Sequence, residues 1–286
     1  MPRIHLPSRK RPLGRLLRNR TAIAGLIICG VVCVAALFAP WLSPHPPLQI
    51  NMQDRFAPPS PRHWMGADDL GRDVFSRLLY GARVSILTGV FSVALGGVIG
   101  AALGLISAFS GGSVDNLVMR FMDGLLAFPP VLLALSIVAA LGASATNVIL
   151  AISVIYVPTF ARAARGAALP VKQLEFVTAT RAVGASEARI LIRTILPNCL
   201  SPILVQASIG FASAVLIEAA LSFLSLGVQP PAPSWGNMLN VGRVFLDHAP
   251  WISLASGGAI FLLVLGVNLL GDAIRDALDP RLAFRA

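Results

Sequence analysis

Long stretches without a charged side chain are the feature that most limits how this chain can fold. No Asp, Glu, Lys or Arg occurs in residues 21–53, 84–114 or 124–161. A transmembrane helix needs about 20 mostly apolar residues, and each of these stretches is longer than that. Only 13% of the residues are charged, whereas a soluble domain averages about 25%. The chain is therefore predicted to be an all-α integral membrane protein, because the apolar runs are continuous and a barrel would require alternation.

The charge-free stretches divide into six predicted transmembrane helices. The stretch 124–161 is too long for one helix and contains a polar patch at 142–147, so it is predicted to form parts of two helices joined by a turn. Pro129 and Pro130 should bend the first of these two helices, since proline interrupts helical hydrogen bonding. The six spans are expected at 21–42, 84–109, 120–141, 147–168, 200–224 and 251–271.

Basic residues at the start of the chain predict its orientation. The first 20 residues contain seven Lys or Arg and no acid, and such segments stay in the cytoplasm. An even number of spans then places both termini there. The predicted order is a basic cytoplasmic arm 1–20, a first transmembrane helix 21–42, an extracytoplasmic loop 43–81, a five-helix core 82–271 that includes a cytoplasmic loop 170–198, and a cytoplasmic tail 272–286.

Several kinds of chemistry have no support in the composition. The three cysteines form no CxxC pair, and the four histidines lack ligand spacing, so no metal site is predicted. A phosphate-binding loop needs Gly-x4-Gly-Lys-Ser/Thr, and the surroundings of Lys10 and Lys172, the two lysines, do not fit it. No catalytic residue and no bound cofactor are therefore expected. The net charge of +10 is attributed to topology rather than to nucleic acid, because aromatic residues for base stacking are scarce.

Small residues recur at every fourth position of the second span and share one helix face. They are Ser92, Gly96, Gly100, Gly104 and Ala108. A face without large side chains allows another backbone to approach closely. Packing within this chain is favoured over contact with another subunit.

The segment VKQLEFVTATRAVGASEARILIRTILPN, residues 171–198, interrupts two membrane spans with polar and charged residues. Apolar positions at Leu174, Val177 and Val183, followed by a second apolar stripe from Ile190 to Leu196, indicate two short helices on the cytoplasmic face. Two interpretations stay open on physical grounds. The segment is either an interfacial loop held by arginine or a projection that inserts into a soluble partner.

The same segment resembles the EAA loop of binding-protein-dependent ABC importer permeases. The resemblance rests on EFVTATRAVG at 175–184, followed by Leu196-Pro197 at the matching offset. Thr178 stands where that family has the glutamate, and Glu175 lies one turn upstream. In that family the loop is a coupling helix seated in the ATPase. The resemblance implies this role for Glu175, Thr178, Ala179, Thr180, Gly184, Leu196 and Pro197.

Further segments resemble the C-type permease subunit of the dipeptide, oligopeptide and nickel branch of that family. They are GADDLGRDVFSRLLYGARVSI at 66–86, EAALSFLSLG at 218–227, PSWG at 233–236 and NLLGDAIRDALDP at 268–280. The resemblance implies a type I ABC importer permease fold in a bacterial inner membrane. It also implies a second homologous permease, two ATPase subunits or domains that bind ATP and Mg²⁺, and an external solute-binding protein.

Five charged residues outside the coupling segment have two interpretations. Asp68, Asp69, Arg72 and Asp73 are expected in the extracytoplasmic loop, as a solvated face or as a docking site for the binding protein. Glu218 is expected near the outer end of the fifth span, as part of an outer gate or as a structural partner of an arginine or a backbone amide.

The expected function is import of a small hydrophilic solute, above all di- and oligopeptides, driven by ATP hydrolysis in partner subunits. Nickel, glutathione or another small solute is the alternative cargo. A transporter driven by an ion gradient is a further alternative, but such proteins place ionisable residues near the bilayer midplane, and the predicted spans are nearly empty of them.

Overall fold

A computed structural model describes residues 19–278, and within these residues every regular element is a helix. One isolated antiparallel bridge joins Ala67 and Asp73. The helices are α2 (Arg20–Leu37), α3 (Ala39–Leu42), α4 (Val74–Ser110), α5 (Gly112–Leu126), α6 (Pro130–Leu141), α7 (Ala145–Lys172), α8 (Glu175–Ala182), α9 (Glu187–Arg189), α10 (Leu196–Phe223), α11 (Trp235–Val244) and α12 (Pro250–Leu278), with a 3-10 turn at Met52–Asp54 and a π-helix at Ile190–Ile195.

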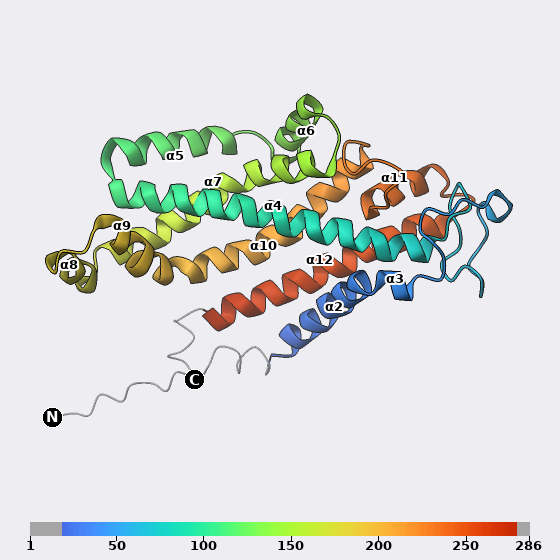
Figure 1. Ribbon diagram of the computed structural model, residues 1–286, viewed down its shortest axis with the longest axis horizontal. Helices are drawn as coiled ribbons and strands as arrows, with labels where there is room; N and C mark the ends of the chain where they lie inside the picture. Colours follow the sequence, from blue (N-terminus) through green and yellow to red (C-terminus); the bar gives the residue numbers. More distant parts are fainter. Residues whose placement is uncertain (1–18, 279–286) are drawn as a thin grey trace.

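The long helices form an elongated bundle (Figure 1). Helices α8 and α9 lie at one end, and the loops that follow α3 lie at the other end. Helix α2 packs along α12, and α4 makes its most extensive contact with α7. In the described part of the chain, five helices are long and apolar enough to cross a membrane, and the bent pair α5 and α6 makes six. This agrees with the predicted number of spans.

The predicted bend in the third span is confirmed and is sharper than a kink. Helices α5 and α6 meet at 89°, with Pro129 and Pro130 at the break. Pro130 occupies the first turn of α6, where its missing N–H removes no helical hydrogen bond. Most of α5 is exposed, and Met122 is its buried side chain. The expected single span 120–141 is therefore two helices.

Several helix ends lie outside their predicted positions. Helix α4 begins at Val74, so the predicted loop 43–81 ends at Asp73, which accepts a hydrogen bond from the backbone of Ser76 at 2.7 Å as the N-cap. Helix α12 continues to Leu278 and therefore includes the start of the predicted tail 272–286. Helix α11 was not predicted, because its short sequence is too polar to register as a span. The predicted arm 1–20 lies almost wholly outside the described residues.

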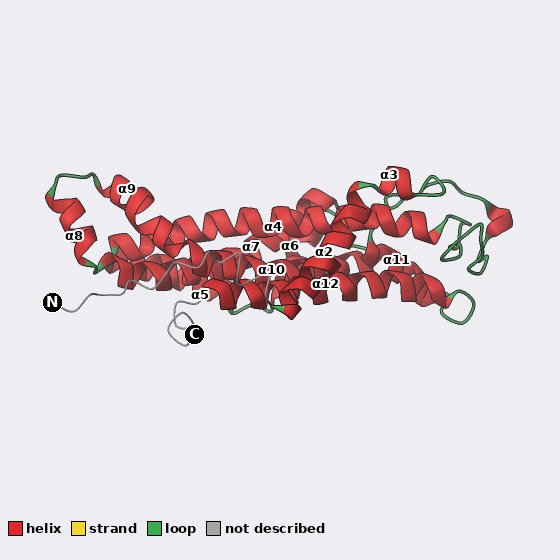
Figure 2. Ribbon diagram, turned by 90° about the horizontal axis from the view of Figure 1, so that it is seen from below, coloured by secondary structure: helices red, strands yellow, loops and turns green. Residues whose placement is uncertain are grey.

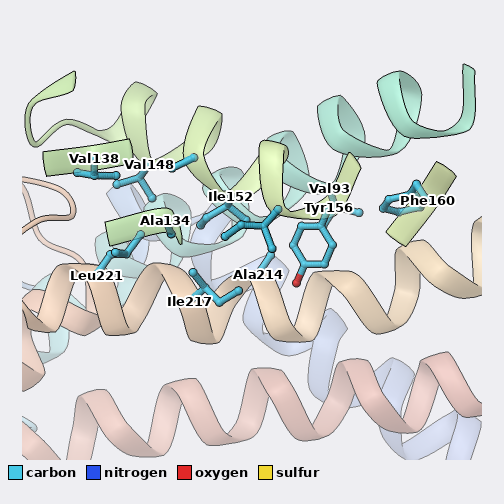
Figure 3. Close-up of a cluster of buried hydrophobic side chains, with 12 residues drawn as sticks. Val93, Ala134, Val138, Val148, Ile152, Tyr156, Phe160, Ala214, Ile217 and Leu221 are labelled. Carbon is cyan, nitrogen blue, oxygen red and sulfur yellow. The ribbon is translucent and has the colours of Figure 1, made fainter. Parts of the chain in front are cut away.

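The central core joins α4, α6, α7 and α10. Figure 3 shows its side chains, with Ile152 and Tyr156 of α7 facing Ala214 and Ile217 of α10. Ala134 and Val138 bring the short helix α6 into the same cluster. Helix α7 therefore packs against α4, α6 and α10 in this cluster.

The glycine face of α4 packs against α7 within the chain, as predicted. A Cβ atom added at Gly96 would lie 2.6 Å from the carbonyl oxygen of Ser153, and one at Gly104 would lie 2.8 Å from the carbonyl carbon of Ala161. Such contacts are shorter than any real Cβ makes. The two backbones therefore touch along this seam, and α4 and α7 form a closely fitted pair.

Candidate functional site

The segment between α7 and α10 folds as a short projection at one end of the bundle. Figure 2 shows α8 and α9 standing out from that end, opposite the loop-rich end. Helix α7 leads into α8 through Gln173 and Leu174, and the π-helix Ile190–Ile195 runs directly into α10. The two predicted short helices are thus present, and both are continuous with long helices of the bundle.

The base of the projection is apolar and buried. Val177 of α8 is 0% exposed, as is Ile190, and Ile195 is 1% exposed. They pack with Leu105 and Ala108 at the end of α4 in one hydrophobic cluster. Burying each such side chain contributes about 1.5–3 kcal/mol. The projection is therefore seated on the bundle.

The crest of the projection is exposed and includes apolar side chains. Val183 is 84% exposed, and Phe176 is 44% exposed. Glu175, Thr178 and Ala179 also face outward. Single exposed apolar residues are common on protein surfaces, whereas a group of them on a projection is typical of an interaction surface.

Polar contacts stiffen the crest. The guanidinium of Arg181 donates to both carboxylate oxygens of Glu187 at 3.0 and 3.1 Å, and this interaction raises the pKa of Arg181. Thr180, which is half-buried, donates its hydroxyl proton to the carbonyl of Phe176 at 2.7 Å. The exposed ion pair adds little stability by itself, but it joins α8 to α9 across the turn.

Gly184 forms the turn between the two short helices. Its φ of +83° lies in the left-handed region, which glycine adopts without strain. No atom lies within 4 Å of a Cβ added there, so backbone conformation rather than space requires glycine within this chain. Leu196 and Pro197 form the first turn of α10, with Leu196 half-buried and Pro197 exposed.

Cationic side chains tie the end of α7 to its neighbours. Lys172 donates to the carbonyl oxygens of Ala108 and Phe109 at 3.2 and 2.6 Å, and so occupies the C-terminal end of α4. Arg165 makes two hydrogen bonds of 2.6 Å to the carboxylate of Asp115 at the start of α5. These contacts connect the end of α7, from which the projection starts, to α4 and α5.

Comparison with known proteins identifies the family. Residues 100–284 match the family described as the binding-protein-dependent transport system inner membrane component. This chain belongs to that family. Residues 11–59 also match the N-terminal transmembrane domain of oligopeptide transport permease C. The protein is thus a multi-pass inner-membrane permease, and the resemblance found in its motifs is confirmed.

Several curated relatives match this permease over almost its whole length. The dipeptide transport system permease protein DppC of Alkalihalophilus pseudofirmus is 46% identical over 94% of this chain and 88% of the relative. The di/tripeptide transport system permease protein DppC of Pseudomonas aeruginosa is 43% identical over 92% and 89%. The glutathione transport system permease protein GsiD of Pectobacterium atrosepticum is 43% identical over 94% and 89%.

A solved structure supports the fold. The inward-facing MetNI methionine ABC transporter superposes with a TM-score of 0.58 over 71% of this permease and 96% of that chain, at 19% sequence identity. This structural similarity confirms the predicted type I importer fold.

Three of the four charged residues singled out at 68–73 are buried in the permease. Asp68, Arg72 and Asp73 are 3%, 7% and 2% exposed, and Asp69 is partly exposed. Arg72 donates to Asp68 at 2.7 Å and to Asp69 at 3.2 Å. Asp68 also accepts hydrogen bonds from the backbone N–H of Arg72 and Leu70, both at 2.9 Å. The expected solvated face is therefore not present, because these groups satisfy one another inside the loop.

Glu218 is also buried, at 0% exposure. It accepts hydrogen bonds from the hydroxyl groups of Ser85 at 2.9 Å and Ser222 at 2.8 Å. Among the described residues no cation pairs with it, so the expected arginine or backbone amide is replaced by two serines. The carboxyl group links α10 to α4.

Two tryptophans that sequence reasoning left without a role hold the loop-rich end together. Trp235 donates its indole N–H to the carbonyl of Leu78 at 2.9 Å, and Trp251 donates to the carbonyl of Ala67 at 3.1 Å. Trp235 belongs to the PSWG motif, which carried a family resemblance but no physical interpretation. The motif therefore marked Trp235 as a residue of interest, but it did not reveal that the indole would bond to the backbone of Leu78.

Proposed function

We propose that this permease imports short peptides, using ATP hydrolysed by partner subunits and solute delivered by an external binding protein. The seated projection with its exposed crest is the observation that carries the coupling part of this proposal. The names of the curated relatives support peptides, since several of them are dipeptide or peptide permeases. Membership of a binding-protein-dependent family favours this mechanism over an ion-gradient-driven one.

Coupling is assigned to α8 and the turn after it. Glu175, Thr178, Ala179, Thr180 and Gly184 line the crest that enters the ATPase, while Leu196 and Pro197 connect the crest to α10. Closure of the ATPases on nucleotide would displace this crest as a rigid body, which biases the bundle between two states. The proposal places the crest, both termini, the arm 1–20 and the tail 272–286 in the cytoplasm and the loop 43–73 outside.

The remaining partners follow from surfaces and from missing motifs. ATP and Mg²⁺ belong to two separate ATPase subunits or domains, since neither lysine of this chain lies in a phosphate-binding loop. An apolar groove of about 720 Å³ between α4 and α10, bordered by Val98, Leu200 and Phe211, supports contact with a second permease, with membrane lipid around the rest of the bundle. The permease itself carries out no catalysis and holds no nucleotide.

The buried charges at the loop-rich end are assigned a supporting role. Asp68, Arg72 and Asp73 would shape the outer loop that receives the binding protein, while the partly exposed Asp69 is the member available for contact. Glu218 would position α10 against α4 near the outer mouth. The burial of Asp68, Arg72, Asp73 and Glu218 favours a structural role over direct contact with solute.

Glutathione is the second candidate cargo, because glutathione permeases are as similar to this chain as several of the peptide permeases. The two cargoes are separated by uptake into proteoliposomes that contain the assembled importer. A dipeptide should compete with labelled glutathione only if the binding protein accepts both. Uptake of labelled dipeptide that needs ATP supports the main proposal, and glutathione uptake unaffected by excess dipeptide contradicts it.

The coupling role is tested by Val183→Asp, with Val244→Asp as the matched control. Both valines are strongly exposed, at 84% and 67%. Val183 directly follows α8 and Val244 ends α11, and Figure 1 shows these two helices toward opposite ends of the bundle. We expect Val183→Asp to reduce co-purification of the ATPase and peptide-stimulated hydrolysis at least about tenfold, since a carboxylate then enters an apolar contact. Val244→Asp should keep both. Full association and stimulation in Val183→Asp would contradict the assignment.

A further inference from the structure

Three metal-ligating side chains that are far apart in the sequence meet beside the first turn of α4. His45, His63 and Asp73 each offer one ligand atom, and these atoms lie within 4.8 Å of one another. The Nδ1 atom of His63 forms a hydrogen bond of 2.9 Å with Oδ1 of Asp73, and Nδ1 of His45 is 3.8 Å from the same oxygen. The two imidazole rings stack with centroids 4.9 Å apart. The histidine spacing gave no sign of this group.

The group is sheltered and includes a polar atom without a partner. The side chains of His63 and Asp73 are 5% and 0% exposed, and that of His45 is 29% exposed. The Nδ1 atom of His45 is itself buried and makes no hydrogen bond within the described residues. Buried polar atoms are normally paired. A cavity of about 30 Å³ borders all three side chains, which is enough for a single water-sized occupant.

Outer contacts orient His63 as they do in known metal sites. Its Nε2 atom faces Oδ2 of Asp54 at 3.4 Å. Asp54 is in turn held by Asn51 at 2.6 Å and by Arg62 at 3.1 Å. A ligating histidine usually donates its second ring N–H to a carboxylate, which fixes the tautomer and directs the other nitrogen at the metal. Here Asp54 supplies that carboxylate, and Nδ1 faces His45 and Asp73.

Hydrogen bonds also fix the orientation of the Asp73 carboxylate. Its Oδ2 atom accepts from the N–H and the hydroxyl group of Ser76 at 2.7 and 2.6 Å, as the N-cap of α4. Its Oδ1 atom is left pointing toward the two histidines. One carboxylate oxygen thus serves the helix and the other serves the histidine pair.

We infer that His45 Nδ1, His63 Nδ1 and Asp73 Oδ1 form a binding site for a late first-row divalent cation of the zinc class, with water as the fourth ligand. Two imidazoles and one carboxylate suit zinc and disfavour Mg²⁺ and Ca²⁺, which take oxygen ligands. Metal–ligand distances of about 2.0–2.2 Å place tetrahedral donors about 3.3–3.5 Å apart. The observed separations of 2.9 and 3.8 Å lie on either side of that value. Bound metal fastens the segment 43–63 to the start of α4.

The site is tested by zinc binding to the full-length permease, purified with its partner subunits through a tag without histidine. Zinc is counted by mass spectrometry after gel filtration and titrated by calorimetry. We expect wild type to hold one zinc per permease more than His45→Ala, and zinc to raise the Tm of wild type alone. His45 is the ligand to replace, because it is the most exposed of the three and is not the helix cap.

Two further variants make the outcome decisive. His248→Ala removes an exposed histidine elsewhere and should keep the additional zinc. His45→Cys should restore it, because a thiolate is a good zinc ligand of similar reach. Equal zinc in wild type and His45→Ala would overturn the inference. So would loss of the additional zinc in His248→Ala as well. None of these results bears on ATPase coupling.

Discussion

The fit between α4 and α7 can be tested with a single methyl group. Replacing Gly104 by Ala places a Cβ 2.8 Å from the carbonyl carbon of Ala161 and 2.9 Å from its Cα, and these neighbours are all backbone atoms. No side-chain rotation relieves such a contact, so α7 must retreat by several tenths of an ångström. Gly97→Ala on the same helix meets the ring of Phe160 at 3.4 Å, which is ordinary contact.

The magnitude follows from comparing these two variants. Both gain the same helix propensity, about 0.5–1 kcal/mol for Ala over Gly, so that gain cancels in the difference. Overpacking a close-fitted interior costs about 1–3 kcal/mol. We therefore expect Gly104→Ala to be less stable than Gly97→Ala by about 1–3 kcal/mol, with a Tm lower by several degrees.

A thiol-reactive dye in detergent provides the assay. Cys199 is 0% exposed and lies in the hydrophobic cluster at the base of the projection formed by α8 and α9. With the partly exposed Cys29 and the exposed Cys33 replaced by Ala, the dye reacts with Cys199 as the protein unfolds. Equal Tm values for the two glycine variants would refute the backbone contact, and would return the glycine face to a role between subunits.

Two further predictions concern the loop-rich end and the buried carboxyl group. Trp251→Phe leaves the buried carbonyl of Ala67 without its donor and should lower stability by about 1–3 kcal/mol, whereas Trp64→Phe, at a residue 59% exposed, should change little in the same dye assay. Glu218→Ala removes the acceptor of two buried hydroxyl groups and opens a cavity, so it should cost about 2–4 kcal/mol. Glu218→Gln keeps a carbonyl acceptor and should cost clearly less. An equal loss in Gln and Ala would contradict the hydrogen-bonding role.

The number of spans was predictable from sequence, but their ends were not. A charge-free interval reports where the bilayer excludes charge, and this sets the count. Helix α4 nevertheless begins ten residues before that interval, and its two arginines are paired: Arg77 donates to the carbonyl of Pro47 at 3.2 Å, and Arg83 donates to the carbonyl of Leu37 at 2.8 Å. The cap at Asp73 is local, but these carbonyl partners of Arg77 and Arg83 lie far away in the sequence and could not be read from the charge pattern.

The fold of the segment 171–198 was also predictable in outline. A glycine between two short apolar stripes indicates a helix, a turn and a helix, and Gly184 has the positive φ that such a turn requires. Which stripe residue is buried was not readable, since Val177 at 0% and Val183 at 84% exposure look alike in the sequence. The approach of His45 to His63 was equally hidden, because a loop without regular structure brings them together.

The seam between α4 and α7 limits how the bundle can respond to its ATPase. Two helices whose backbones touch along several turns cannot slide past each other without clashes, so a displacement of α8 should move α4 and α7 together. The hydrogen bond from Lys172 to the carbonyl of Phe109 also ties the end of α7 to the end of α4. The remaining freedom lies where regular α-helical hydrogen bonding is interrupted, at the proline break before α6 and at the π-helix Ile190–Ile195 that enters α10. On this argument Gly104→Ala, which loosens the seam, should slow ATP-driven peptide uptake more than it weakens ATPase association. An unchanged uptake rate in a folded Gly104→Ala importer would show that coupling does not run through this pair of helices.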